Sequence, residues 1–246
     1  MVMRMMDVRL LVAMGVAVAS APAGANDWDW MVEPYAWATT IRSDLEAARP
    51  PIEGSSEMAF SDILDKLDGS LQVHAEGRGD KIGAFADFTY LGISESRTGD
   101  FARTETDLDT RLFEAAWVWI PGGQRDRGLD LFGGVRWIDA DLKVEIDPEN
   151  PQLAGRVLDV GDDYLDAMLG ARYTWAPSDR WRITARADVS AGQTEGAWNA
   201  SLMAHYSIGN GRVLLGYRHL EVELESAGTR TDLAMTGPVI GYAFAF

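Results

Sequence analysis

Three histidines, His74, His205 and His219, are the residues of this sequence best suited to proton transfer. His205 precedes Ser207 by two residues, a spacing that would put a base and a hydroxyl nucleophile on the same face of a strand. His219 has Glu221 close by, but no Asp-x-His pair stands there. A single histidine on a strand is usually packed or solvated, so we expect no catalytic residue.

Acidic side chains gather between residues 139 and 166. Asp139-x-Asp141 and Asp162-Asp163 offer carboxylate oxygens of the kind that Ca²⁺ prefers, although the spacing of an EF-hand loop is absent. Acidic loops are usually just solvated. We therefore predict no metal site and no cofactor.

A larger set of charged residues alternates with apolar neighbours. It comprises the acids Glu33, Asp87, Glu114 and Asp188 and the arginines Arg136, Arg172, Arg182, Arg186 and Arg218, with His74, Glu76 and His205 at the same parity. Successive side chains of a strand point to opposite faces, so in a closed sheet with an apolar outer face these groups must point inward. Buried charges must pair or neutralise. The pattern predicts a lumen charge network and leaves two interpretations open: a paired polar plug, or a thin path for ions or small solutes.

The elements that would position these residues are strands, because the dominant period is two from residue 26 onward. The expected strands cover residues 28–41, 70–77, 81–94, 105–120, 129–146, 163–176, 180–190, 197–208, 211–224 and 231–246. Most match the roughly 9–11 residues that a tilted membrane strand needs. The sequence thus predicts an all-β fold, a transmembrane antiparallel up-and-down β-barrel of about ten strands. The alternatives are a barrel of eight strands, and a soluble barrel or sandwich.

Connections and aromatic residues agree with this fold. Short connections, 77–80, 121–128, 177–179 and 209–210, alternate with mostly longer ones, 42–69, 95–104, 147–162, 191–196 and 225–230. This is the usual contrast between periplasmic turns and external loops. Tryptophans gather near the short turns, as in a membrane-interface belt.

One short helix is expected in the first long loop, over residues 61–69. Phe60, Ile63, Leu64 and Leu67 recur at helical spacing, Ser61 is a candidate N-cap, and Gly69 is a candidate end. Its apolar face would pack on the barrel rim or wall, or the helix would act as a gate over the lumen mouth.

The two ends of the chain carry export and assembly signals. Residues 1–25 have a basic start, an apolar run over 10–19 and a small-residue site, which predicts a signal peptide cleaved between Ala25 and Asn26 and a barrel domain over residues 26–246. The final residues, with Gly241, Tyr242, Phe244 and Phe246, put aromatic rings on one strand face. This ending resembles the β-signal that the outer-membrane assembly machinery recognises in Gram-negative barrels.

Several motifs extend this resemblance over most of the chain. They are Trp-x-x-x-Pro-Tyr-x-Trp at 30–37, Phe-Ser-Asp-Ile-Leu at 60–64 followed by Leu67-Asp68, Asp-x-x-Tyr-Leu at 87–91 and Gly-Ala-Arg-Tyr at 170–173. The chain resembles the small outer-membrane barrels of the OmpA-type, OmpW-like and opacity-protein group. More narrowly, it is similar to an uncharacterised proteobacterial barrel family. These motifs are architectural and imply no activity.

Three functions from different classes follow. We favour a structural or envelope role with a lumen largely plugged by charged side chains. A narrow passive channel and an outer-membrane enzyme acting on lipid or peptide are the alternatives. Expected partners are outer-membrane lipid and lipopolysaccharide, and the assembly machinery during biogenesis. The net charge of −16 argues against nucleic acid, and the oligomeric state stays open.

Overall fold

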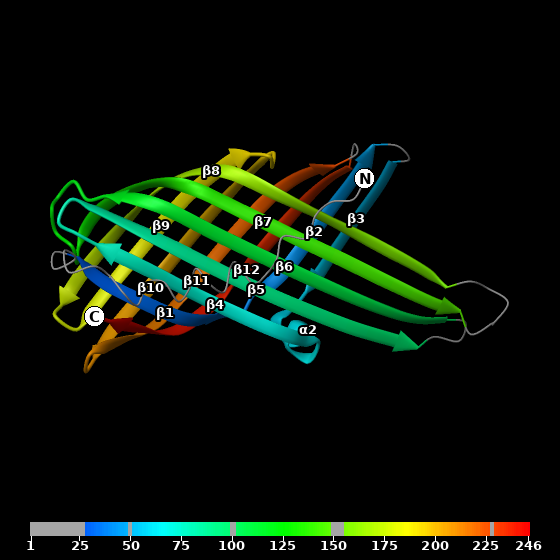
Figure 1. The fold of residues 1–246 in the computed structure, drawn as a ribbon, viewed down its shortest axis with the longest axis horizontal. Helices are drawn as coiled ribbons and strands as arrows, with labels where there is room; N and C mark the ends of the chain where they lie inside the picture. The colour runs from blue at the N-terminus through cyan, green and yellow to red at the C-terminus, as the bar shows by residue number, and fades with distance from the viewer. Residues whose placement is uncertain (1–27, 49–50, 99–101, 149–154, 227–228) are drawn as a thin grey trace.

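The protein is a closed antiparallel β-barrel with ten strand positions (Figure 1). The computed structural model describes residues 28–48, 51–98, 102–148, 155–226 and 229–246. The expected signal peptide and its cleavage site, Ala25 and Asn26, lie outside the described residues. Within the described ranges, no helix is long and apolar enough to cross a bilayer.

The strands follow one another around the barrel with antiparallel neighbours throughout. They are β1 (Asp29–Trp37), β2 (Thr40–Ala48), β3 (Pro51–Met58), β4 (Leu67–Arg78), β5 (Ile82–Thr98), β6 (Ala102–Trp119), β7 (Gly128–Pro148), β8 (Arg156–Ser178), β9 (Trp181–Gly192), β10 (Gly196–Ile208), β11 (Gly211–Ser226) and β12 (Thr229–Ala245), and the helix is α2 (Phe60–Asp65). Twelve strands fill ten positions because β1 and β2 pair in turn with the same strand, β12, and β3 pairs only with β2.

Alternation along each strand separates a lumen face from an outer face. On β6 and β7, Glu114 pairs in register with Arg136, and both side chains are fully buried. The exposed large hydrophobic residues of these strands fall at the opposite parity, among them Trp117, Trp119 and Val135. The predicted fold class is confirmed.

The outer face is apolar around the whole barrel. Exposed rings and aliphatic side chains include Leu169, Trp175, Trp181, Leu202, Leu215, Ile240 and Phe244. A soluble protein rarely exposes an apolar patch larger than a few hundred Å². In a bilayer such a face is stable, and a closed ladder satisfies every backbone donor within the membrane. The outer face is therefore that of a barrel that spans a membrane.

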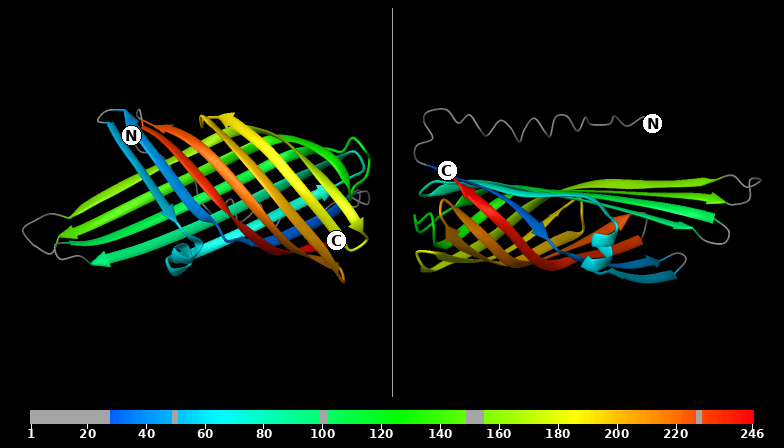
Figure 2. Two further views of the ribbon diagram at one scale, coloured as in Figure 1. Left: turned by 180° about the vertical axis from the view of Figure 1, so that it is seen from behind. Right: turned by 90° about the horizontal axis from the view of Figure 1, so that it is seen from below.

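The strands extend farther from the short-turn end than the sequence predicts. The connections expected over 95–104 and 225–230 are largely strand, since β5 reaches Thr98 and β11 reaches Ser226. Beyond the ends of β4 and β9 the wall splits, and β5–β8 continue as one sheet apart from β10–β12, β2 and β3 (Figure 2). The prediction missed these extensions, and strand β3, because polar and apolar residues do not alternate regularly there, as in residues 94–98 and in the adjacent Val157 and Leu158.

Helix α2 is shorter than predicted. It begins after Ala59, which is the N-cap, so Ser61 does not cap it, and Gly69 belongs to β4 rather than ending the helix. Of the predicted apolar face only Ile63 is buried, against the lumen-facing Leu91 and Ile93. Phe60, Leu64 and Leu67 remain exposed.

The barrel closes where β1 meets β12. Met31 pairs with Ala245, and beyond that pair Trp30 and Phe246 exchange two backbone hydrogen bonds of 3.1 and 3.0 Å. The first and the last residues of the barrel chain therefore both lie at its short-turn end. Gly241 faces Tyr35 across this pairing, and a Cβ there would lie 2.8 Å from the Tyr35 Cβ, so the close approach requires glycine.

Deleting Phe246 should slow assembly in cells, because it removes both closing hydrogen bonds and an outward ring that is 71% exposed. Phe246→Ala keeps the backbone bonds and should show a smaller delay. Pulse-chase labelling would follow the compact form that migrates differently on gels before and after boiling. Equal folding rates for the deletion and the parent chain would contradict a role for this residue in assembly.

Candidate functional site: the charged lumen

The centre of the lumen holds a compact cluster of three acids and three arginines, here called the central cluster: Asp87, Glu114, Asp188, Arg136, Arg186 and Arg218. Glu114 accepts from all three arginines, at 2.7 Å from Arg136 Nη2, 2.9 Å from Arg186 Nη2 and 3.1 Å from Arg218 Nη2. Asp188 receives Arg136 Nη2 at 2.5 Å and Arg186 Nε at 2.7 Å. Acids and arginines are equal in number, so the cluster is charge-balanced.

Neutral side chains complete the central cluster. Asn199 donates to Asp188 at 2.9 Å and accepts from Arg218 Nε at 2.9 Å. The Tyr35 hydroxyl donates to Asp87 at 2.8 Å. The Glu114–Arg218 pair joins β6 to β11, five strands apart around the barrel, and the Tyr35–Asp87 bond joins β1 to β5 across β4.

A second balanced group lies nearer the short turns. Arg172 donates to Glu76 and, from Nε at 2.8 Å, to Asp130. Arg78 reaches the same two acids at 3.0 and 2.8 Å. His74 lies between the two groups, with Nδ1 3.1 Å from Asp87 and Nε2 3.5 Å from Glu76.

On the other side of the central cluster part of the lumen is apolar, beside the buried polar residues Gln72, Thr89 and Ser190. The next inward position on several strands, counted away from the short turns, is a buried apolar residue. These residues are Leu112 after Glu114, Ile138 after Arg136, Leu220 after Arg218 and Trp37 after Tyr35. They belong to one buried hydrophobic group with Ala197, Val222 and Met235, here called the apolar layer. The Trp37 ring also stacks under the Arg218 guanidinium, 4.9 Å from its centroid.

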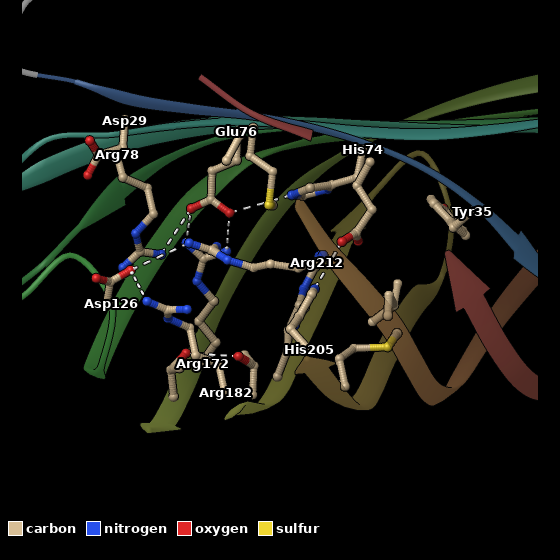
Figure 3. Close-up of a pocket in the computed structure, with 18 of the residues that line it drawn as sticks. Asp29, Tyr35, His74, Glu76, Arg78, Asp126, Arg172, Arg182, His205 and Arg212 are labelled. Carbon is tan, nitrogen blue, oxygen red and sulfur yellow. Dashed lines mark hydrogen bonds and ion pairs between the residues drawn. The ribbon is translucent and has the colours of Figure 1, made fainter. Parts of the chain in front are cut away.

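A cavity of about 630 Å³ occupies the short-turn end of the lumen (Figure 3). Its inner end is formed by Tyr35, Asp87 and Arg218, and its lining reaches Asp126 and Asn210 in the turns. It therefore opens at the short-turn end of the barrel and ends at the central cluster.

The nine residues predicted as one lumen network fall into separate groups. Asp87, Glu114, Asp188, Arg136, Arg186 and Arg218 lie together, whereas Arg172 pairs with Glu76 and Asp130, Glu33 lies 2.9 Å from His205, and Arg182 pairs with Asp126. The prediction omitted Asp130 and Asp166, although both share the inward parity of Arg136 and Arg172. That parity would have found them if it had been followed to the strand ends.

Asp166 has a different role from the paired acids, because it holds the β9–β10 connection. Its carboxylate accepts from the backbone N–H of Gln193 and Thr194 at 3.0 and 3.1 Å, and from the Thr194 and Ser190 hydroxyls at 2.5 and 3.1 Å.

Asp166→Ala should lower the free energy of unfolding by about 1–3 kcal/mol, because buried donors lose their acceptor. Urea titration in lipid vesicles would measure it. Asp163→Ala removes an exposed acid of the same strand and should change stability by less than about 0.5 kcal/mol. Equal effects of the two changes would contradict the capping role.

The acidic pairs and the histidines that the sequence offers as possible metal or catalytic sites do not come together as such sites. Asp139 and Asp141 both pair with Arg111, at 2.5 and 3.3 Å. Asp162 and Asp163 point to opposite faces of β8, and no cluster suited to a metal ion exists among the described residues. His205 bonds to Glu33 rather than to Ser207, and His219 faces outward, with Nδ1 2.5 Å from the Thr236 hydroxyl.

Comparisons with known proteins find similarity of architecture only. No family model and no curated protein sequence matches the chain. Among solved structures, it is similar to the outer-membrane protease OmpT of Escherichia coli (TM-score 0.49, 7% identity, 92% of this chain and 99% of that one). It is also similar to the translocator domain of the autotransporter NalP of Neisseria meningitidis (0.45, 16%, 97% and 94%) and to the attachment invasion locus protein Ail of Yersinia pestis (0.40, 10%, 88% and 98%). These likenesses assign no function.

Proposed function

We propose that the protein is a structural outer-membrane barrel whose lumen carries no solute across the membrane. The observation that carries this proposal is the succession of two different barriers along the lumen: the central cluster, with Glu114 and Arg136 fully buried, and the apolar layer beyond it. An ion that left the central cluster through the apolar layer would do so without hydration. Transferring an unpaired charge into such a medium costs at least several kcal/mol.

The arrangement also favours a role in stability rather than transport. Conduction requires sites that bind a solute weakly enough to release it. In the central cluster, each carboxylate instead accepts from arginines or neutral donors of its own chain. These contacts join walls of the barrel that are far apart in sequence, as the Glu114–Arg218 pair does over 104 residues.

An enzymatic activity has less support than a structural role with a closed lumen. His205 is held by Glu33 across the lumen, and no hydrogen bond connects it to a serine in the part of the chain that the structure describes. We therefore propose no enzymatic activity.

A liposome-swelling assay tests the proposal. Vesicles carrying the purified barrel should swell no faster than empty vesicles in isotonic arabinose, glycine or potassium chloride, while a general porin serves as the positive control. Swelling that increases with the amount of folded barrel would favour the narrow channel instead.

A further inference from the structure

The cavity at the short-turn end differs from the rest of the lumen in how its arginines are paired. The central cluster pairs three acids with three arginines, and the next group pairs Glu76 and Asp130 with Arg172 and Arg78. At the cavity mouth, Arg182 and Arg212 have a single acid between them. Their Nη2 atoms lie 3.1 and 4.0 Å from the same oxygen of Asp126, Oδ1.

Asp126 is a weak partner for two cations. It lies in the β6–β7 turn, and its side chain is 61% exposed, whereas Arg182 and Arg212 are only 20% and 26% exposed. Within the described residues, no second carboxylate lies within 4.0 Å of either arginine. Figure 3 shows both guanidinium groups directed at this one carboxylate. The two arginines of the mouth therefore share one acid at ion-pair distance, and that acid is poorly shielded from water.

We propose that the cavity mouth binds a small oxyanion, a carboxylate or phosphate group from the periplasm, between Arg182 and Arg212 in the place that Asp126 occupies. Guanidinium groups form paired hydrogen bonds with such planar or tetrahedral oxyanions. Asp126 then acts as an internal competitor, which a ligand displaces outward into solvent. This site goes beyond the structural role proposed above.

The cavity behind the mouth sets the size and chemistry of the bound molecule. Its volume of about 630 Å³ lies within the ~300–1,000 Å³ usual for small-molecule sites. Met31, Met203 and Leu214 form an apolar part of the wall, and Thr184 and His205 supply polar groups. These surroundings suit a short organic acid or an organic phosphate better than a polymer.

Calorimetric titration of the folded barrel in detergent micelles tests the site, with succinate and inorganic phosphate as separate probes. Arg182→Gln and Arg212→Gln should each weaken binding at least tenfold, whereas Asp126→Asn should tighten it several-fold. Arg180→Gln, an exposed arginine at the same end whose side chain contacts Tyr206 rather than the cavity, should leave affinity unchanged. Each variant is first checked for the heat-dependent gel shift of the folded barrel.

The outcomes separate cleanly. Binding of either probe with this order of variants supports the site, and the tighter probe identifies the favoured group. No binding to the parent chain or to Asp126→Asn would overturn it. So would equal losses in Arg180→Gln and Arg212→Gln, or an Asp126→Asn variant that binds more weakly than the parent.

Discussion

Glu114→Ala should lower the free energy of unfolding by about 3–5 kcal/mol, the usual cost of breaking a fully buried ion pair. Glu114 is 0% exposed and accepts hydrogen bonds from three arginines. Its removal leaves three guanidinium groups facing only Asp87 and Asp188. Urea titration of the barrel in lipid vesicles, followed by tryptophan fluorescence, would measure the change.

A matched control and a double substitution sharpen this prediction. Glu105→Ala removes a half-exposed acid of the same strand, 3.9 Å from Arg103, and should cost no more than about 1 kcal/mol. Adding Arg136→Met to Glu114→Ala restores equal numbers of acids and arginines and should recover part of the loss. A Glu114→Ala effect as small as that of Glu105→Ala, or a double variant that loses the sum of both single effects, would contradict charge pairing as the source of stability.

Gly134→Ala should prevent or severely weaken barrel closure, at a cost of more than about 3 kcal/mol. A Cβ at this position would lie 1.9 Å from the Ala115 carbonyl oxygen and 2.6 Å from the Ala116 Cα. Both obstacles are backbone atoms of β6, so no side-chain rotation relieves the overlap, and overpacking of this kind is costly. Loss of the heat-dependent gel shift would report it.

The neighbouring glycine provides the control. The nearest atom to a Cβ on Gly133 would be the Leu169 Cδ2 at 3.0 Å, the end of a flexible side chain on the outer face, and the Met168 carbonyl oxygen would lie at an ordinary contact distance of 3.7 Å. Gly133→Ala should therefore fold. If Gly134→Ala folded with the yield and stability of Gly133→Ala, the close approach of β6 and β7 would be wrong.

How far the sequence predicts this molecule depends on the contrast between the two faces of each strand. Where one face meets lipid and the other the lumen, alternation identifies both the strand and the inward residues, as for Arg182 to Asp188. In β3 and at the ends of β5–β8 farthest from the short turns, polar and apolar residues do not alternate regularly, so these segments carried no such signal. Helix α2 was placed correctly but extended too far, because Leu67 continues its spacing while already belonging to β4.

Which charged residues point into the lumen was predictable, but which of them form ion pairs with one another was not. Parity gives the direction in which Glu114 points and not which residue it meets, since Arg218 lies 104 residues away and five strands around the sheet. The pairs Glu33–His205 and Arg182–Asp126, which line the cavity, could not be predicted for the same reason. Asp126, which completes the mouth, lies in a turn where alternation makes no prediction.

Single-channel recording of the folded barrel in a planar bilayer tests most directly whether a path runs along the lumen. In 1 M potassium chloride the parent protein should add no discrete current steps above the bare bilayer, at either polarity, while a general porin inserted under the same conditions gives them. Stable, uniform steps from heat-modifiable parent protein would contradict the closed lumen. The central cluster and the apolar layer would then have to be the walls of a pore.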